Sequence, residues 1–150
     1  NLSGASLFQT QLGSARLDGA DLSGARVAAD LTRASLKRAV LRGADFSADM
    51  RNQSMGLMRG VLRSADLEGA DLTEANLARA DLEFASLRGA ILKRANFKGA
   101  DLGGADLTGA DVSGASFEDA DLNSAHLVGL LGEAETTFQR ARNVGAAARQ

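Results

Sequence analysis

The stretch GADLGGADLTGADVSGASFEDADL, which runs from Gly99 to Leu122, repeats one five-residue word with small changes. Each word has a large apolar residue at its centre and a small residue two positions earlier. A period of five fits neither the 3.6-residue repeat of an amphipathic helix nor the strict alternation of a half-buried strand. Self-similarity at a short fixed period is typical of repeat architectures, in which stacked units bury one continuous core. The stretch therefore predicts a solenoid.

The same word extends over most of the chain. There are 26 word centres between Leu2 and Leu127, and 19 of them are leucine. The residue two positions before a centre is alanine at 22 of 25 positions, and the exceptions are Thr10, Gln53 and Gly60. Glycine is frequent two positions after a centre, where a sharp turn requires a positive φ. Each word is therefore predicted to be a short extended piece followed by a corner.

This pattern resembles the pentapeptide-repeat family, whose consensus is A-(D/N)-L-x-x, over residues 1–128. The resemblance implies an all-β fold, a right-handed quadrilateral β-helix in which four words form one coil. The chain would then have about six to seven coils, stacked at about 4.8 Å. We expect the β-helix to be irregular at 47–61. Residues 129–150 are expected to form a C-terminal cap or tail, with a short helix over 133–142.

Stacking every fourth word predicts the columns of side chains inside the coils. One predicted column is entirely leucine: Leu2, Leu22, Leu41, Leu62, Leu82, Leu102 and Leu122. Another places two phenylalanines on adjacent coils: Leu17, Leu36, Met55, Leu77, Phe97 and Phe117.

The rhythm of the words slips in three places. The spacings from Val27 to Leu31 and from Phe46 to Met50 are each one residue shorter than five. The spacing from Met55 to Leu62 is two residues longer than five. Because the slips cancel, we predict that the words stay in the coils and that local bulges absorb the misfit. The stretch RNQSMGLMRG at 51–60 is the candidate contact loop, and its candidate residues are Arg51, Asn52, Met58 and Arg59. The alternative is a tolerated irregularity that methionine fills.

Charge is unevenly distributed along the chain. The net charge of −2 argues against a general nucleic-acid or anionic-membrane binder. Residues 99–139 nevertheless hold eight acidic residues and no Lys or Arg. Stacking places Asp81, Asp101 and Asp121 above one another. It also predicts a second acidic column of Asp30, Asp49 and Asp71. On the face of Phe97 it predicts a polar column without Asp: Arg16, Ser35, Ser54, Asn76, Asn96 and Ser116.

Two interpretations of the acidic end stay open. The resemblance implies that its carboxylates could imitate duplex phosphates and bind a type II topoisomerase, as gyrase-protecting members of the family do. The other interpretation is that the aspartates cap local turns and keep the surface solvated. The candidate partner surface consists of Asp81, Asp101, Asp106, Asp111, Glu118, Asp119 and Asp121.

Nothing in the sequence indicates catalysis, so we expect a protein that is not an enzyme and needs no cofactor or metal. There is no Cys, no phosphate-binding loop and no calcium-loop spacing. The single histidine, His126, is at an outward position. A candidate contact patch consists of outward apolar residues, with Val40 and Val61 stacked on one face: Phe8, Val40, Val61, Phe84 and Ile91.

Beyond Leu127 the words stop, and the apolar core must be covered. Leu130, Leu131 and Phe138 are candidates for the cap, or for the two-fold dimer contact that the resemblance implies. We expect a non-catalytic scaffold that binds another protein, alone or as a subunit of a larger assembly. No apolar run is long enough to span a bilayer. The bacterial cytoplasm is the expected compartment, and a chloroplast or thylakoid lumen is the alternative. Asn1 lies inside the repeat, so we expect a longer natural protein.

Overall fold

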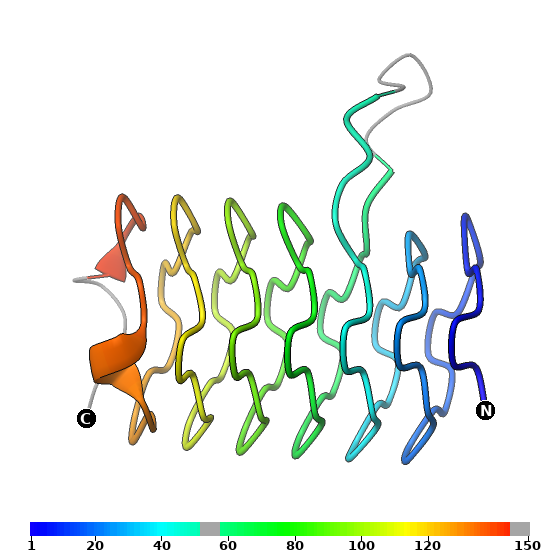
Figure 1. Ribbon diagram of the computed structural model, residues 1–150, viewed down its shortest axis with the longest axis horizontal. Coiled ribbons are helices and arrows are strands. Elements are labelled where there is room, and N and C mark those ends of the chain that lie inside the picture. Colours follow the sequence, from blue (N-terminus) through cyan, green and yellow to red (C-terminus); the bar gives the residue numbers. More distant parts are fainter. Residues whose placement is uncertain (52–57, 145–150) are drawn as a thin grey trace.

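The computed structural model describes residues 1–51 and 58–144, in which the chain winds into a stack of coils. The first and the last described coils lie at opposite ends of the stack (Figure 1). Isolated parallel bridges hold the coils together, and from Val61 to Leu131 the paired residues lie 20 positions apart, as in Asp81 with Asp101. No α-helix occurs in the described residues, and none of their helices is long and apolar enough to cross a membrane.

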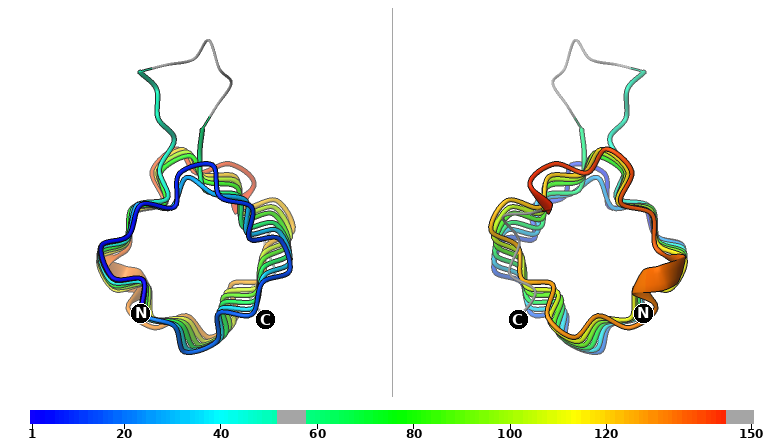
Figure 2. Two further views of the ribbon diagram at one scale, coloured as in Figure 1. Left: turned by 90° about the vertical axis from the view of Figure 1, so that its right-hand side faces the viewer. Right: turned by 90° about the vertical axis from the view of Figure 1, so that its left-hand side faces the viewer.

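The bridges form four columns, and the coils look four-cornered along the axis (Figure 2). Each coil bonds to the coils on both sides, through a column residue on one side and through its flanking residues on the other. The Asp101 N–H donates to the Ala80 carbonyl at 3.0 Å, and the Leu102 N–H donates to the Asp121 carbonyl at 2.8 Å. Column A is Ser6, Arg26, Asp45, Asn76, Asn96, Ser116 and Thr137; column B is Gln11, Asp30, Val61, Asp81, Asp101, Asp121 and Arg142; column C is Arg16, Ser35, Asp66, Ser86, Asp106 and His126; column D is Asp21, Val40, Asp71, Ile91, Asp111 and Leu131.

The word centres and their alanines fill the interior of the coils. From Leu22 to Leu127, the described centres that belong to the coils are buried, and from Ala25 onwards so are the alanines two positions before them. The Phe97 and Phe117 rings stack with centroids 4.8 Å apart, and the Phe138 ring stacks on Phe117 at 5.2 Å. The large residue of each word therefore points inward, as the five-residue period predicts.

The irregular region is an insertion into one word. Asp45 pairs with Asn76, 31 positions later, because the chain leaves the coil after Phe46 and returns at Gly60. Asp49 and Met58 form an antiparallel bridge, and the Gly60 N–H donates to the Phe46 carbonyl at 2.9 Å. We call residues 47–59 the projecting segment, because its described residues, 47–51 and 58–59, stand out sideways from the stack (Figures 1 and 2).

The projecting segment overturns the predicted register of the N-terminal half. The prediction kept the words of Met50 and Met55 in the coil, but Met50 lies in the projecting segment and Met55 lies outside the described residues. The column that contains Leu41 therefore continues at Leu72, and not at Leu62. The other predicted inner column is wrong before Leu77, and its corrected members are Leu7, Val27, Phe46, Leu77, Phe97, Phe117 and Phe138.

The same error misplaced three sets of surface residues. Asp30 is in column B, Asp71 is in column D, and Asp49 is in the projecting segment, so these aspartates do not stack. Val40 and Val61 also belong to different columns. The polar column beside Phe97 contains Asp45, and its N-terminal members differ from the predicted Arg16 and Ser35, while Ser54 lies outside the described residues.

The helix predicted over 133–142 is not formed. The helical element there is the 3₁₀ turn η2, Glu133–Glu135, after which the coil resumes with Thr137 in column A and Arg142 in column B. Residues 116 and 137 pair 21 positions apart, because the turn adds one residue to this coil. The division into residues 1–128 and a cap at 129–150 stays a prediction.

Candidate functional site

The aspartates of the predicted partner surface first serve the corners of their own coils. A carboxylate oxygen of each column aspartate accepts the N–H two residues later, which stabilises the turn. Asp101 accepts from Gly103 at 3.0 Å, and Asp106 accepts from Thr108 at 2.9 Å. The same bond occurs in columns B and D at Asp30, Asp81, Asp111, Asp121, Asp21 and Asp71.

The second oxygen of most of these carboxylates forms an ion pair with a neighbouring coil. Asp106 pairs with Arg88 at 2.8 Å, and Asp111 pairs with Lys93 at 3.3 Å. Their basic partners precede residue 99, so the local sequence alone did not show them. At the C-terminal end the partners are arginines of the last coil: Arg140 for Glu118 and Asp119, and Arg142 for Asp121. Most of the acidic block is therefore neutralised by neighbouring coils.

Hydrogen bonds keep several of these carboxyl groups ionised. The Ser113 hydroxyl is the main cause that lowers the pKa of Asp111, against the opposing effect of burial. Arg140 is the main cause that lowers the pKa of Asp119. These carboxylates are thus engaged as structural acceptors.

Asp81 is buried, with only 3% of its surface exposed, and joins the coils to the projecting segment. Its carboxylate pairs with the Arg63 guanidinium at 2.6 Å and with the Arg59 guanidinium at 3.4 Å. Arg59 also donates to the Arg79 carbonyl at 3.2 Å. Asp81 therefore helps to hold the base of the projecting segment against the next coil.

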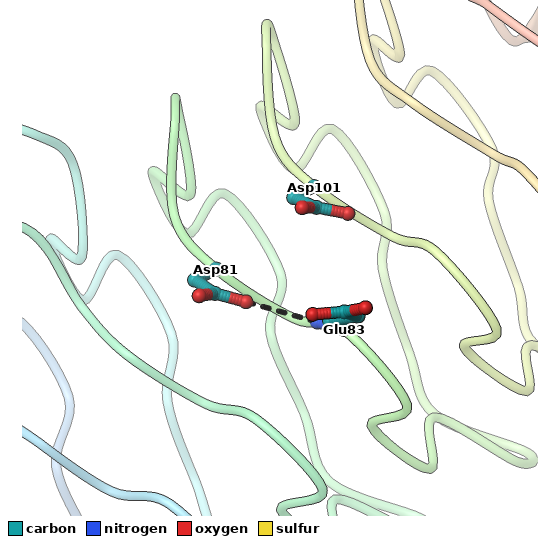
Figure 3. Close-up of side chains that lie close together, drawn as sticks. All are labelled: Asp81, Glu83 and Asp101. Atoms are coloured by element: carbon teal, nitrogen blue, oxygen red, sulfur yellow. Dashed lines mark hydrogen bonds between the residues drawn. The ribbon is translucent and has the colours of Figure 1, made fainter.

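Asp101 differs from its neighbours in the same column, because it forms no ion pair within residues 1–51 and 58–144. Oxygens of Asp81, Glu83 and Asp101 lie within 4.8 Å of one another (Figure 3). Arg63 supplies positive charge to this group, since it pairs with Glu83 at 2.5 Å as well as with Asp81. Sequence reasoning missed Glu83 and Arg63, which lie in corners and carry no repeat signal.

The candidate contact loop corresponds to the projecting segment. The Arg51 side chain is 84% exposed and pairs with Asp49 at 3.3 Å. Met58 forms the antiparallel backbone bridge with Asp49, and the Met58 sulfur accepts a hydrogen bond from the Gln9 side-chain amide at 3.9 Å. Arg59 anchors the base as described, and Asn52 lies outside the described residues.

The candidate apolar patch does not form one surface. Phe8 is 48% exposed, Phe84 is 63% exposed and Ile91 is 38% exposed, but they lie at different corners and columns. Val40 and Val61 are half-buried column residues. His126 is a column C residue with an exposed side chain.

The candidate cap residues lie around the last coil. The Phe138 ring packs on Phe117 and is partly buried, and Leu130 is also partly buried. Leu131 is 58% exposed. Their role as a cap or a dimer contact stays a prediction.

Comparison with known proteins gives one family and several similar structures. The family model described as pentapeptide repeats matches in eight copies over residues 1–28, 27–52, 61–94 and 100–129. The matches leave out most of the projecting segment. Among curated proteins, nothing matches the chain.

Two solved structures illustrate the likeness. HetL from the cyanobacterium Nostoc sp. strain PCC 7120, a pentapeptide repeat protein involved in heterocyst differentiation regulation, is 37% identical with a TM-score of 0.84. The match covers 93% of this chain but only 60% of HetL, so the chain spans less than two thirds of that protein. The plasmid-mediated fluoroquinolone resistance protein QnrB1, in a trypsin-treated form, is 20% identical with a TM-score of 0.59, over 93% of this chain and 74% of QnrB1. This second likeness shows the fold alone.

Proposed function

Because the chain belongs to the pentapeptide-repeat family, whose fold is a right-handed β-helix, we propose that it is a non-catalytic scaffold that presents a rigid surface to another protein. The filled interior supports this proposal. Word centres from Leu22 to Leu127 occupy the space inside the coils, so the outside of the stack is the part that a partner can reach. The same fold serves many roles, and the site has to be argued from the surface.

The projecting segment is the part of this surface that we assign to partner contact. Its base is fixed by the Asp49–Met58 bridge, by the Gly60–Phe46 hydrogen bond and by the bonds of Arg59 to the next coil. Arg51, at the described end of the segment, is largely exposed. Because the base is fixed and Arg51 pairs with Asp49, the described ends of the segment are preorganised, and preorganisation lowers the conformational entropy lost on binding.

The likeness to HetL favours a regulatory form of this proposal. HetL is described as involved in heterocyst differentiation regulation. A scaffold without chemistry of its own can regulate by occupying a surface of another protein. We therefore propose regulation through contact, in isolation or within a larger assembly.

Site-specific photocrosslinking tests the assignment. A photoreactive residue replaces Arg51 in one protein and Glu74 in a control, because Glu74 is also exposed, with 61% of its side chain accessible against 84% for Arg51, but lies in the corner after column D. Expression in the native host and irradiation should give a discrete higher-mass adduct from position 51 and not from position 74. Adducts of equal yield from both positions, or from neither, would contradict the proposal.

A DNA mimic that acts on a type II topoisomerase such as gyrase is the second candidate. The stacked carboxylates of Asp81, Asp101 and Asp121 favour it. The ion pairs that engage Asp81 and Asp121 weaken it, since they leave one carboxylate of the three without an ion pair among the described residues. A supercoiling assay with purified gyrase tests it: absence of inhibition and of quinolone protection at micromolar protein would remove this candidate.

A further inference from the structure

Phe84 occupies the same corner position that glycine holds in several other words of this chain, such as Gly89 and Gly104. Its φ is 60°, in the left-handed region that disfavours side chains. Its ring lies over the backbone of Gly104 in the next coil, where an added Cβ would be 2.5 Å from a ring carbon. The ring is supported by this backbone, yet Phe84 is the most exposed large apolar residue in the described part of the chain, at 63%.

Carboxylates flank the same corner. Glu83 precedes Phe84, and its Cγ lies 3.6 Å from the position of a Cβ at Gly103. The Asp101 carboxylate lies 3.2 Å from that same position and accepts the Gly103 N–H. We call Glu83, Phe84, Asp101, Gly103 and Gly104 the Phe84 corner. An aromatic ring and a carboxylate thus lie beside two residues without side chains.

The charge of the corner is incompletely balanced from within the chain. Arg63 pairs with Asp81 and Glu83, and Arg59 pairs with Asp81. Asp101 is left without an ion pair in residues 1–51 and 58–144, although its oxygens approach those of Asp81 and Glu83 (Figure 3). An additional cation at Asp101 would relieve this concentration of negative charge.

We propose that the Phe84 corner binds an arginine side chain of a basic segment in a partner protein. The planar guanidinium stacks on the exposed Phe84 ring and donates hydrogen bonds to the Asp101 carboxylate. Gly103 and Gly104 add no side chains of their own to the corner. This inference rests on the proposed scaffold function and adds the chemistry of the partner.

A peptide titration tests the proposal directly. The probe is the fluorescein-labelled peptide acetyl-Arg-Gly-Arg-Gly-Arg-amide, and fluorescence anisotropy measures its binding to the full chain. Phe84→Ala and Asp101→Asn should each weaken binding by roughly threefold or more. The matching lysine peptide should bind more weakly than the arginine peptide, because ammonium groups neither stack nor form a two-pronged contact.

Two variants at the other end of the stack serve as controls. Asp21→Asn removes a charge from a carboxylate that, like Asp101, accepts an N–H two residues later and has no ion pair in the described residues. Phe8→Ala removes another exposed ring. Both should leave affinity unchanged, and all four variants should stay folded, as one cooperative thermal transition would show.

Three results would overturn the proposal: no binding of the arginine peptide, equal losses in the controls, or equal binding of the lysine peptide. A failure here is distinguishable from failure of the scaffold function, because the crosslink at position 51 reports on partner contact independently. If that crosslink forms in the unmodified chain and in Phe84→Ala with equal yield, only the arginine site is excluded.

Discussion

At the scale of the residue, glycine at the corners has two separate physical reasons. The first is a positive φ, which Gly104 and Gly109 share at 65° and 70°. The second is the close approach of a long side chain from the preceding coil. Arg38 lies over Gly69, Arg79 lies over Gly99 and Phe84 lies over Gly104, whereas nothing lies within 4 Å of a Cβ at Gly109.

This difference predicts unequal costs for the same substitution. Gly109→Ala should lower the free energy of unfolding by about 1 kcal/mol, the cost of a side chain at positive φ. Gly104→Ala should cost roughly 1–3 kcal/mol more, because the new methyl group overlaps the Phe84 ring and forces it to move. Urea unfolding followed by circular dichroism measures both.

The double variant Phe84→Ala/Gly104→Ala isolates the cause. Removal of the ring should return the cost of Gly104→Ala to that of Gly109→Ala, because only the φ penalty remains. A cost of Gly104→Ala that is the same with and without the ring would show that the approach of Phe84 is unimportant.

The corner hydrogen bonds predict how stability depends on pH. The pKa of Asp111 is lowered, chiefly by the Ser113 hydroxyl, and the Asp21 and Asp30 pKa values are lowered by Ser23 and Thr32 in the same way. A carboxyl group with a lowered folded-state pKa contributes stability above its unfolded value, near 3.8, and loses it as the pH falls through the folded value. The free energy of unfolding should therefore be steady from pH 7 to about 5 and decline below about 4.

Ser113→Ala separates this effect from general acid destabilisation. The variant should be less stable than the unmodified chain at pH 6, and the difference should shrink as the pH falls through the folded-state pKa of Asp111. Thr136→Val is the control, because the Thr136 hydroxyl donates to the Val112 and Gly132 carbonyls, which do not titrate. A Ser113→Ala difference that is constant with pH would contradict the assignment.

At the scale of the element, the five-residue word predicts the regular coils but not the projecting segment. Ala48 lies two positions before Met50, as the alanine does before the centre of a regular word, so the sequence alone assigns both residues to a coil. The antiparallel pairing of Asp49 with Met58 excludes this, and it depends on a contact between residues nine positions apart that no periodicity reveals. The register before residue 47 was misassigned for this reason alone.

The repeat likewise predicts some features of the candidate site and not others. The stacking of Asp81, Asp101 and Asp121 could be predicted, because no irregularity separates them. The burial of Asp81 and its ion pair with Arg59 could not be predicted, because Arg59 reaches Asp81 from the projecting segment. Asp101 has no ion pair among the described residues because the Arg63 guanidinium pairs with Asp81 and Glu83 instead. The repeat does not encode this orientation of Arg63.

The projecting segment should be removable without loss of the coils. Deletion of residues 48–58 joins Ser47 to Arg59 and restores a regular word from Phe46 to Leu62, with Gly60 at the small inward position. Both ends of this word are already buried in the core. Thermal unfolding should remain one cooperative transition, with a midpoint within about 5 °C of the full chain.

A deletion of equal length at residues 51–61 is the matched control. It restores the same spacing but places Asp49 at the small inward position, where a carboxylate would be buried without a partner. This variant should lose roughly 10 °C or more, or fail to fold. Equal midpoints for the two deletions would show that the word pattern does not decide the stability of this coil.

At the scale of the whole molecule, stability is that of a one-dimensional stack, in which each coil is held only by its neighbours. The last coil covers the one before it. Phe138 packs on Phe117, and the carbonyls of Leu131, Thr137 and Arg142 accept the N–H groups of Val112, Phe117 and Leu122. The residues after 128 therefore act on the structure mainly through the coil that they complete.

A chain that ends at Val128 should for this reason associate more than the full chain. Its terminal coil would expose the Phe117 ring and a row of unpaired N–H groups, and such an edge pairs with other chains. Multi-angle light scattering over a range of concentrations should show a mass that rises for the shortened chain and stays lower for the full one. Phe138→Ala in the full chain removes the ring but keeps the backbone bonds, so it should lower stability without the same rise in mass.

The two-fold dimer contact that family resemblance implies for Leu130, Leu131 and Phe138 makes the opposite prediction, because shortening would then remove the interface and lower the mass. The direction of the change thus decides between a last coil that closes the stack and one that joins two copies of it.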